Sequence, residues 1–76
     1  MYKLEIETNN TVKRIEDPRR VKVVDLLFTT KVKVMDGNGI WTDIGHLFLY
    51  QDACDAARKI RNAISNKETF VEVDLN

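Results

Sequence analysis

The two side chains of this chain best suited to nucleophilic and base chemistry are its only cysteine, Cys54, and its only histidine, His46. Cys54 falls in the first turn of a predicted helix, where the positive end of the helix dipole favours a thiolate. His46 precedes it in the chain and would have to approach the sulfur as a general base. No third residue that would orient the histidine is evident, and a small residue at a helix boundary explains Cys54 without chemistry. We therefore expect no enzymatic activity and assign no catalytic residue.

The polar loop Asp36–Gly39 begins like two ligand-binding motifs and completes neither. A calcium-binding loop would have glycine at its sixth position and glutamate at its twelfth, where this chain has Trp41 and Leu47. A dinucleotide-binding fingerprint would have its third glycine where this chain has Thr42. One histidine and one cysteine also cannot form a closed zinc site within one chain. The loop is therefore predicted to be a hairpin turn, and we expect neither a metal nor a cofactor.

The basic residues are concentrated in one segment, residues 13–33, while the net charge of the whole chain is zero. A net charge of zero argues against strong non-specific binding to polyanions. A nucleic-acid-binding surface is nevertheless the second interpretation, and it would use Lys13, Arg14, Arg19, Arg20, Lys31 and Lys33. The simpler alternative is a solvated strand face whose lysines protect the edge of a sheet.

The strongest pattern in the chain is a predicted hairpin that is apolar on both faces, with arms over residues 21–35 and 40–50. If Asp36–Gly39 forms a four-residue loop, Met35 faces Ile40 and the register of the whole hairpin follows. One face then carries the better core, in the pairs Val34–Trp41, Phe28–Leu47 and Leu26–Leu49. The other face presents Leu27, Ile44, Phe48 and Tyr50. A small domain buries one face of such a ribbon by itself, so this second face is a candidate binding surface.

The remaining segments supply the elements that position this hairpin. Residues 51–65 form the one clear helix, because alanine and isoleucine recur there at the helical period. Residues 2–7 alternate apolar and polar side chains, residues 11–16 would return as an edge strand, and residues 69–75 alternate again. The predicted order is ββββαβ. It describes a single α+β domain over residues 1–76, with a small antiparallel sheet of about five strands packed on one helix.

Length and composition limit the class of protein further. The chain has 76 residues, of which 43% are hydrophobic and 32% charged, a composition typical of a folded domain. No apolar run approaches the roughly 20 residues that a membrane-spanning helix needs. A single cysteine allows no internal disulfide, and the acidic, alternating start of the chain is unlike a signal peptide. We therefore expect a cytoplasmic protein without a membrane partner.

No motif identifies a family. In size and composition the chain is similar to the short α+β proteins of bacteriophages and mobile elements, many of which bind and inhibit host proteins. That similarity implies a non-enzymatic protein-interaction module that acts by covering the surface of a protein partner or of a second copy. The expected anchors are Leu27, Phe48 and Tyr50, with Ile44 on the same face, because buried apolar and aromatic side chains dominate interface energies. Arg19 and Arg20 would steer association.

The second face of the hairpin leaves three alternatives open. Curvature of the sheet, or the N-terminal segment folding over it, would bury Leu27 and Phe48 within the monomer. Homodimerisation would cover the same side chains with a second copy of the chain. A foreign protein would use the face as its docking surface.

Overall fold

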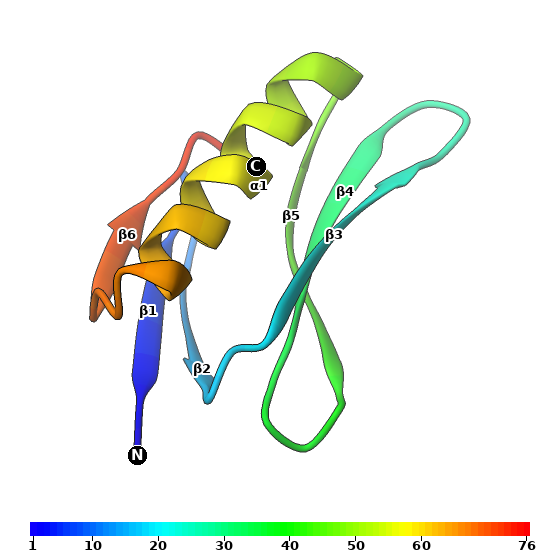
Figure 1. Ribbon diagram of the computed structural model, residues 1–76. Coiled ribbons are helices and arrows are strands. Elements are labelled where there is room, and N and C mark those ends of the chain that lie inside the picture. Colours follow the sequence, from blue (N-terminus) through cyan, green and yellow to red (C-terminus); the bar gives the residue numbers. More distant parts are fainter.

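The computed structural model describes all 76 residues, which form six strands and one helix (Figure 1). In chain order these are β1 (Lys3–Glu7), β2 (Val12–Glu16), β3 (Arg20–Asp25), β4 (Thr30–Met35), β5 (Trp41–Leu47), α1 (Tyr50–Ser65) and β6 (Phe70–Glu72). The strands make two three-stranded sheets, β2-β1-β6 and β3-β4-β5, and α1 packs against both. The predicted α+β class, with strands packed on a single helix, is confirmed.

The number and pairing of the strands differ from the sequence prediction in two places. Residues 21–35 are not one arm, because the chain reverses at Leu26–Thr29, where the Leu26 N–H donates to the Thr29 carbonyl at 2.8 Å. This turn contains no glycine, proline or asparagine, so the usual local signal of a turn is missing. The last strand, β6, pairs in parallel with β1. The result is six strands in two sheets in place of about five in one antiparallel sheet.

The loop between β4 and β5 is one residue longer than predicted, because Met35 pairs with Trp41 and not with Ile40. The carboxylate of Asp36 holds this loop by accepting the backbone N–H groups of Asn38 at 2.8 Å and Ile40 at 3.1 Å. A short polar side chain that bonds to the backbone after it is a common way to close a turn. The predicted turn is therefore confirmed, with its register shifted.

Ile44 lies in the core, next to a bulge in β5. Lys33 pairs with Asp43 and Val32 pairs with Gly45, so Ile44 has no partner of its own on β4. The one-residue shift of the loop pairs Thr42 with the buried Val34, so Ile44, two residues further along β5, lies on the same inward face and is only 3% exposed. The expectation that Ile44 contributes to an exposed binding face is wrong for this reason.

The helix agrees with the predicted one to within a residue, and its small side chains let it lie close to both sheets. Its buried stripe consists of Ala53, Ala56, Ala57, Ile60 and Ala63. The strands and the C-terminal segment complete the core with Leu4, Ile6, Ile15, Val21, Val32, Val34, Ile44, Val71, Val73 and Leu75. The helix is neither long nor apolar enough to cross a membrane.

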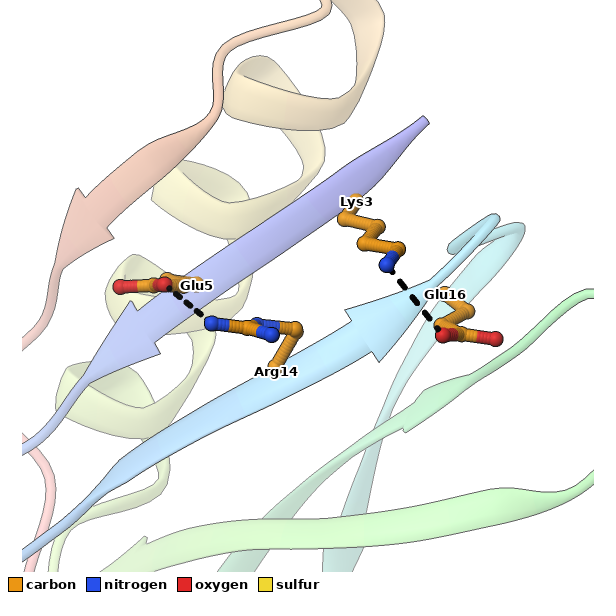
Figure 2. Close-up of polar contacts among 4 residues, drawn as sticks. All are labelled: Lys3, Glu5, Arg14 and Glu16. Atoms are coloured by element: carbon orange, nitrogen blue, oxygen red, sulfur yellow. Dashed lines mark hydrogen bonds and ion pairs between the residues drawn. The ribbon is translucent and has the colours of Figure 1, made fainter. Parts of the chain in front are cut away.

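Opposite charges face each other across the pair of strands β1 and β2 (Figure 2). Glu5 is the register partner of Arg14, and their carboxylate and guanidinium groups lie 3.1 Å apart. Lys3 is the partner of Glu16, with 3.7 Å between the charged groups. Directly opposite ion pairs on exposed sheet faces contribute about 0.2–1 kcal/mol each. They favour the observed register of this hairpin and leave Arg14 with its charge already paired.

Candidate functional site

Six large apolar side chains are exposed together at one end of the molecule, and we call this surface the apolar tip. It consists of Leu26, Leu27 and Phe28 from the β3–β4 turn and Phe48, Leu49 and Tyr50 from the connection between β5 and α1. Their exposed fractions run from 45% to 87%. Most of the exposed large apolar residues of the chain are therefore gathered in two short segments.

The two segments of the apolar tip meet because their strands are neighbours. Thr30, the first residue of β4, pairs with Asp25 at the end of β3 and with Leu47 at the end of β5. The Thr29 hydroxyl donates to the Leu47 carbonyl at 3.3 Å. Figure 1 shows the β3–β4 turn and the start of α1 at the same end of the molecule. The antiparallel pairing of three strands thus builds this surface.

The rim of the apolar tip is acidic. The segments 25–30 and 47–53 contain Asp25 and Asp52 but no lysine or arginine. A hydrogen bond with the Cys54 thiol raises the pKa of the Tyr50 phenol above its ordinary value of 10.0, and the charge of Asp25 adds to the shift. Asp25 and Cys54 therefore both lie near the Tyr50 hydroxyl, and the tip combines apolar anchors with negative charge.

The predicted anchor residues are partly brought together. Leu27, Phe48 and Tyr50 all lie in the apolar tip, whereas Ile44 is buried. Leu26 and Phe28, predicted to be core residues, belong to the exposed set, because the turn at residues 26–29 carries them out of the sheet. No local pattern marked that turn, so the sequence could not have placed these two side chains.

Arg19 and Arg20 lie at the other end of β3 and line an open groove of about 560 Å³. We call it the basic groove, and its lining residues are Arg19, Arg20, Val21, Lys22, Trp41, Arg61, Ile64 and Ser65. The Lys22 ammonium lies 4.1 Å from the centre of the Trp41 ring. The Arg61 guanidinium donates to the Val21 carbonyl at 2.9 Å. The groove therefore joins β3, β5 and the C-terminal half of α1.

The six residues predicted for nucleic-acid binding do not form one free surface. Arg14 is paired with Glu5, and Lys31 is paired with Asp43 at 3.1 Å. Lys13 donates to the Asp43 carbonyl at 2.5 Å. Three of the six are thus engaged within the molecule, Arg14 and Lys31 by residues of the neighbouring strand and Lys13 by a carbonyl of the other sheet.

Arg19, Arg20 and Lys33 take part in no ion pair. Arg19 and Arg20 line the basic groove together with two cations that are not among the six predicted residues. These are Lys22 and Arg61. Arg61 comes from the helix, and its place beside β3 depends on the packing of α1, so no pattern in the sequence indicated it.

The candidate nucleophile and base are not joined in the structure. The His46 side chain is exposed on β5 and makes no hydrogen bond, while Cys54 is half-buried on α1 beside Tyr50. No group of three or more His, Cys, Asp and Glu side chains is placed to hold a metal ion.

Comparison of the chain with protein-family models, with curated proteins and with solved structures finds no match in any of the three. We therefore infer function from the surfaces of this chain itself.

Proposed function

We propose that this chain is a non-enzymatic protein-interaction module that docks its apolar tip on another protein and covers part of that protein's surface. The observation that carries the proposal is the β3–β4 turn, where Leu26, Leu27 and Phe28 occupy positions that usually hold glycine, proline, asparagine or serine.

The residue types of this turn are unusual, because turns normally have small or polar residues and this one has large apolar residues exposed to solvent. Leu27 and Phe28 are 87% and 80% exposed, so burial in the monomer does not explain them. Contiguous apolar surface of this kind marks interaction sites in monomeric proteins. Violations of local sequence rules in natural proteins tend to fall at functional sites. A partner that buries these side chains gives the physical reason for their presence.

Phe48, from the second segment of the tip, extends the same surface with a large aromatic anchor that is 80% exposed. Anchors of this kind, once desolvated at the centre of an interface, cost about 2–4 kcal/mol when truncated. Phe28, Leu27 and Phe48 are therefore the residues we expect to dominate the binding energy.

The acidic rim favours a foreign partner over a second copy of the chain. A symmetric contact between two tips would bring Asp25 and Asp52 of one copy close to the same residues of the other. Like charges placed against each other at an interface cost several kcal/mol. The fitting partner is a protein with an apolar pocket bordered by lysine or arginine. We further propose that docking inhibits that partner, as many small phage proteins do.

The test uses a photoreactive amino acid placed at Phe48 in the full chain, with Ile40 as the matched control position. Ile40 is 60% exposed and precedes β5 at the end away from the tip. We expect one discrete cross-linked partner from the Phe48 position and none from the Ile40 position. The partner is then purified and titrated with the unmodified chain.

In that titration Phe48→Asp should weaken binding by at least about 30-fold, since a hot-spot loss is about 2 kcal/mol or more. Ile40→Asp should change it by less than about threefold, because surface substitutions outside a contact have small effects. Equal weakening by both variants would overturn the proposal. So would light scattering that shows a dimer which Phe48→Asp dissociates, since the tip would then be a self-interface.

A further inference from the structure

We propose that the basic groove is a second binding site, and that its ligand is single-stranded nucleic acid. Arg19, Arg20 and Arg61 would contact phosphates, and Trp41 would offer a surface to a base. The site lies at the opposite end of β3 from the apolar tip, so the proposal does not depend on the protein-interaction role.

The charge of the groove points to an anionic ligand. Four of its eight lining residues are cations, Arg19, Arg20, Lys22 and Arg61, and none is an acid. None of these four cations takes part in an ion pair, whereas Lys3, Arg14, Lys31 and Arg58 each have a carboxylate partner. The chain as a whole carries no net charge. Positive charge is therefore concentrated at this one site without an internal counterion.

The arginines suit phosphate in particular, because a guanidinium presents a rigid set of donors that match phosphate oxygens. Arg61 is already oriented, since it donates to the Val21 carbonyl at 2.9 Å. The groove volume of about 560 Å³ falls within the range of about 300–1,000 Å³ that is usual for ligand sites. A phosphate with its attached nucleoside is a ligand of suitable size.

Trp41 distinguishes a nucleotide from a simple anion. The indole is only partly buried, and the Lys22 ammonium covers its ring at 4.1 Å from the centre. This lysine can move from the ring to a phosphate when a base takes its place. Aromatic and cationic side chains on one surface are the combination that binds single strands, because every base has a face that can stack.

The cations continue beyond the groove, which favours a polymer. Arg20 and Lys22 are alternate residues of β3, so their side chains leave the same sheet face about 6.6 Å apart. Lys33 on β4 is the register partner of Lys22 and has no ion pair. This row follows a sheet face and can accompany successive phosphates of one strand. A single strand suits the groove better than two other anionic polymers. The bases of a duplex are paired and cannot stack on Trp41, and acidic side chains have no aromatic plane that could stack there.

Trp41 is the only tryptophan of the chain, so its fluorescence reports directly on the groove. The probe is an oligothymidylate of about 12 nucleotides, a length within the range of known single-strand sites. We expect saturable quenching with a dissociation constant of about 1–100 µM at physiological salt. Four cations predict that the logarithm of affinity falls with that of salt with a slope of about −2.8.

Arg20→Gln and Arg61→Gln should each weaken binding by about fivefold and reduce the salt slope by about 0.7, as expected for one lost phosphate contact. Lys59→Gln is the matched control, because it removes the same charge from an exposed position of α1 that does not line the groove. It should leave both quantities unchanged. Circular dichroism melts of all three variants show whether each is folded.

Several outcomes would overturn the proposal. These are no saturable quenching by the oligothymidylate, or equal losses in Lys59→Gln and Arg20→Gln. If thymidine monophosphate or a duplex of the same length bound as tightly as the oligothymidylate, the groove would not be a site for single strands. Tighter binding of polyglutamate would show that the occupant is an acidic protein segment.

Discussion

A Cβ atom at Gly45 would lie 2.9 Å from the carbonyl oxygen of Asn76 and equally close to the Cβ of Leu75. At the next position, His46 and Asn76 exchange two backbone hydrogen bonds of 2.9 and 3.0 Å. The same C-terminal segment bonds to β1 and the turn after it, where the Val73 N–H donates to Glu7 and the Asn9 N–H to Leu75. The two sheets therefore meet through this segment, and the glycine leaves room for it.

Gly45→Ala should weaken that junction. The new methyl group overlaps backbone atoms, and overpacking of this kind costs about 1–3 kcal/mol of unfolding free energy. Chemical denaturation measures the loss. Amide hydrogen exchange locates it, since the Asn76 and Asn9 amides should exchange faster in this variant. Gly39→Ala separates backbone strain from overlap, because its Cβ meets no atom within 4 Å while its φ of +82° disfavours any side chain. It should lower stability without faster exchange at Asn76. Unchanged exchange at Asn76 in Gly45→Ala would contradict the role assigned to the glycine.

Leucine-to-alanine substitutions should separate the core from the apolar tip. Leu75 is 0% exposed, and truncating a buried leucine costs about 2–5 kcal/mol. Leu27 is 87% exposed, and its truncation should change stability by less than about 0.5 kcal/mol. Urea denaturation of the two variants provides the comparison. A large loss for Leu27→Ala would mean that the β3–β4 turn packs on the core in solution.

The Tyr2 hydroxyl ties the N-terminus to the end of α1, and its contribution should depend on pH. It donates to the carbonyl oxygens of Ala63 at 3.3 Å and Glu68 at 2.5 Å. Burial raises the pKa of this phenol above its ordinary value of 10.0, and the Glu68 carboxylate raises it further. A raised pKa means that the native state holds the proton more tightly. The stabilisation is thus complete below pH 10 and is lost as the pH rises through the raised pKa.

Tyr2→Phe should therefore cost about 0.5–1.5 kcal/mol of unfolding free energy at neutral pH, the contribution of a typical hydrogen bond. The difference from the unmodified chain should shrink above pH 10. Denaturation midpoints of both proteins between about pH 7 and pH 11 test this linkage. A difference that stays constant over this range would show that Tyr2 does not titrate with the shift described.

Cys54→Ala should lower the pKa of Tyr50 towards its ordinary value, because hydrogen bonding with the thiol is the first cause of the upward shift. Spectrophotometric titration in a Tyr2→Phe background observes Tyr50 alone, since these are the only two tyrosines. Asp52→Asn serves as the control, because Asp52 is not among the groups that shift this phenol. An unchanged titration curve for Cys54→Ala would show that the Cys54 thiol does not form a hydrogen bond with the Tyr50 phenol in solution.

Local periodicity predicted the elements whose signal is complete within a short stretch of chain. The alanine stripe of α1 and the alternation around Leu4 and Ile6 each define a buried face without help from distant residues. The Asp36–Gly39 turn was predictable for the same reason, because its side chains act on their own backbone. The alternation of the predicted hairpin also indicated Leu27, Phe48 and Tyr50 as exposed apolar residues.

Tertiary structure alone decided how those elements combine. The reversal at Leu26–Thr29 has no turn residues, and the bulge at Ile44 changes which side chains face the core. The pairing of β1 with β6 and the approach of Arg61 to β3 join residues far apart in the chain. A residue's own neighbours set its backbone preference and the face it occupies, whereas strand pairing and side-chain clusters depend on packing the whole chain around one core.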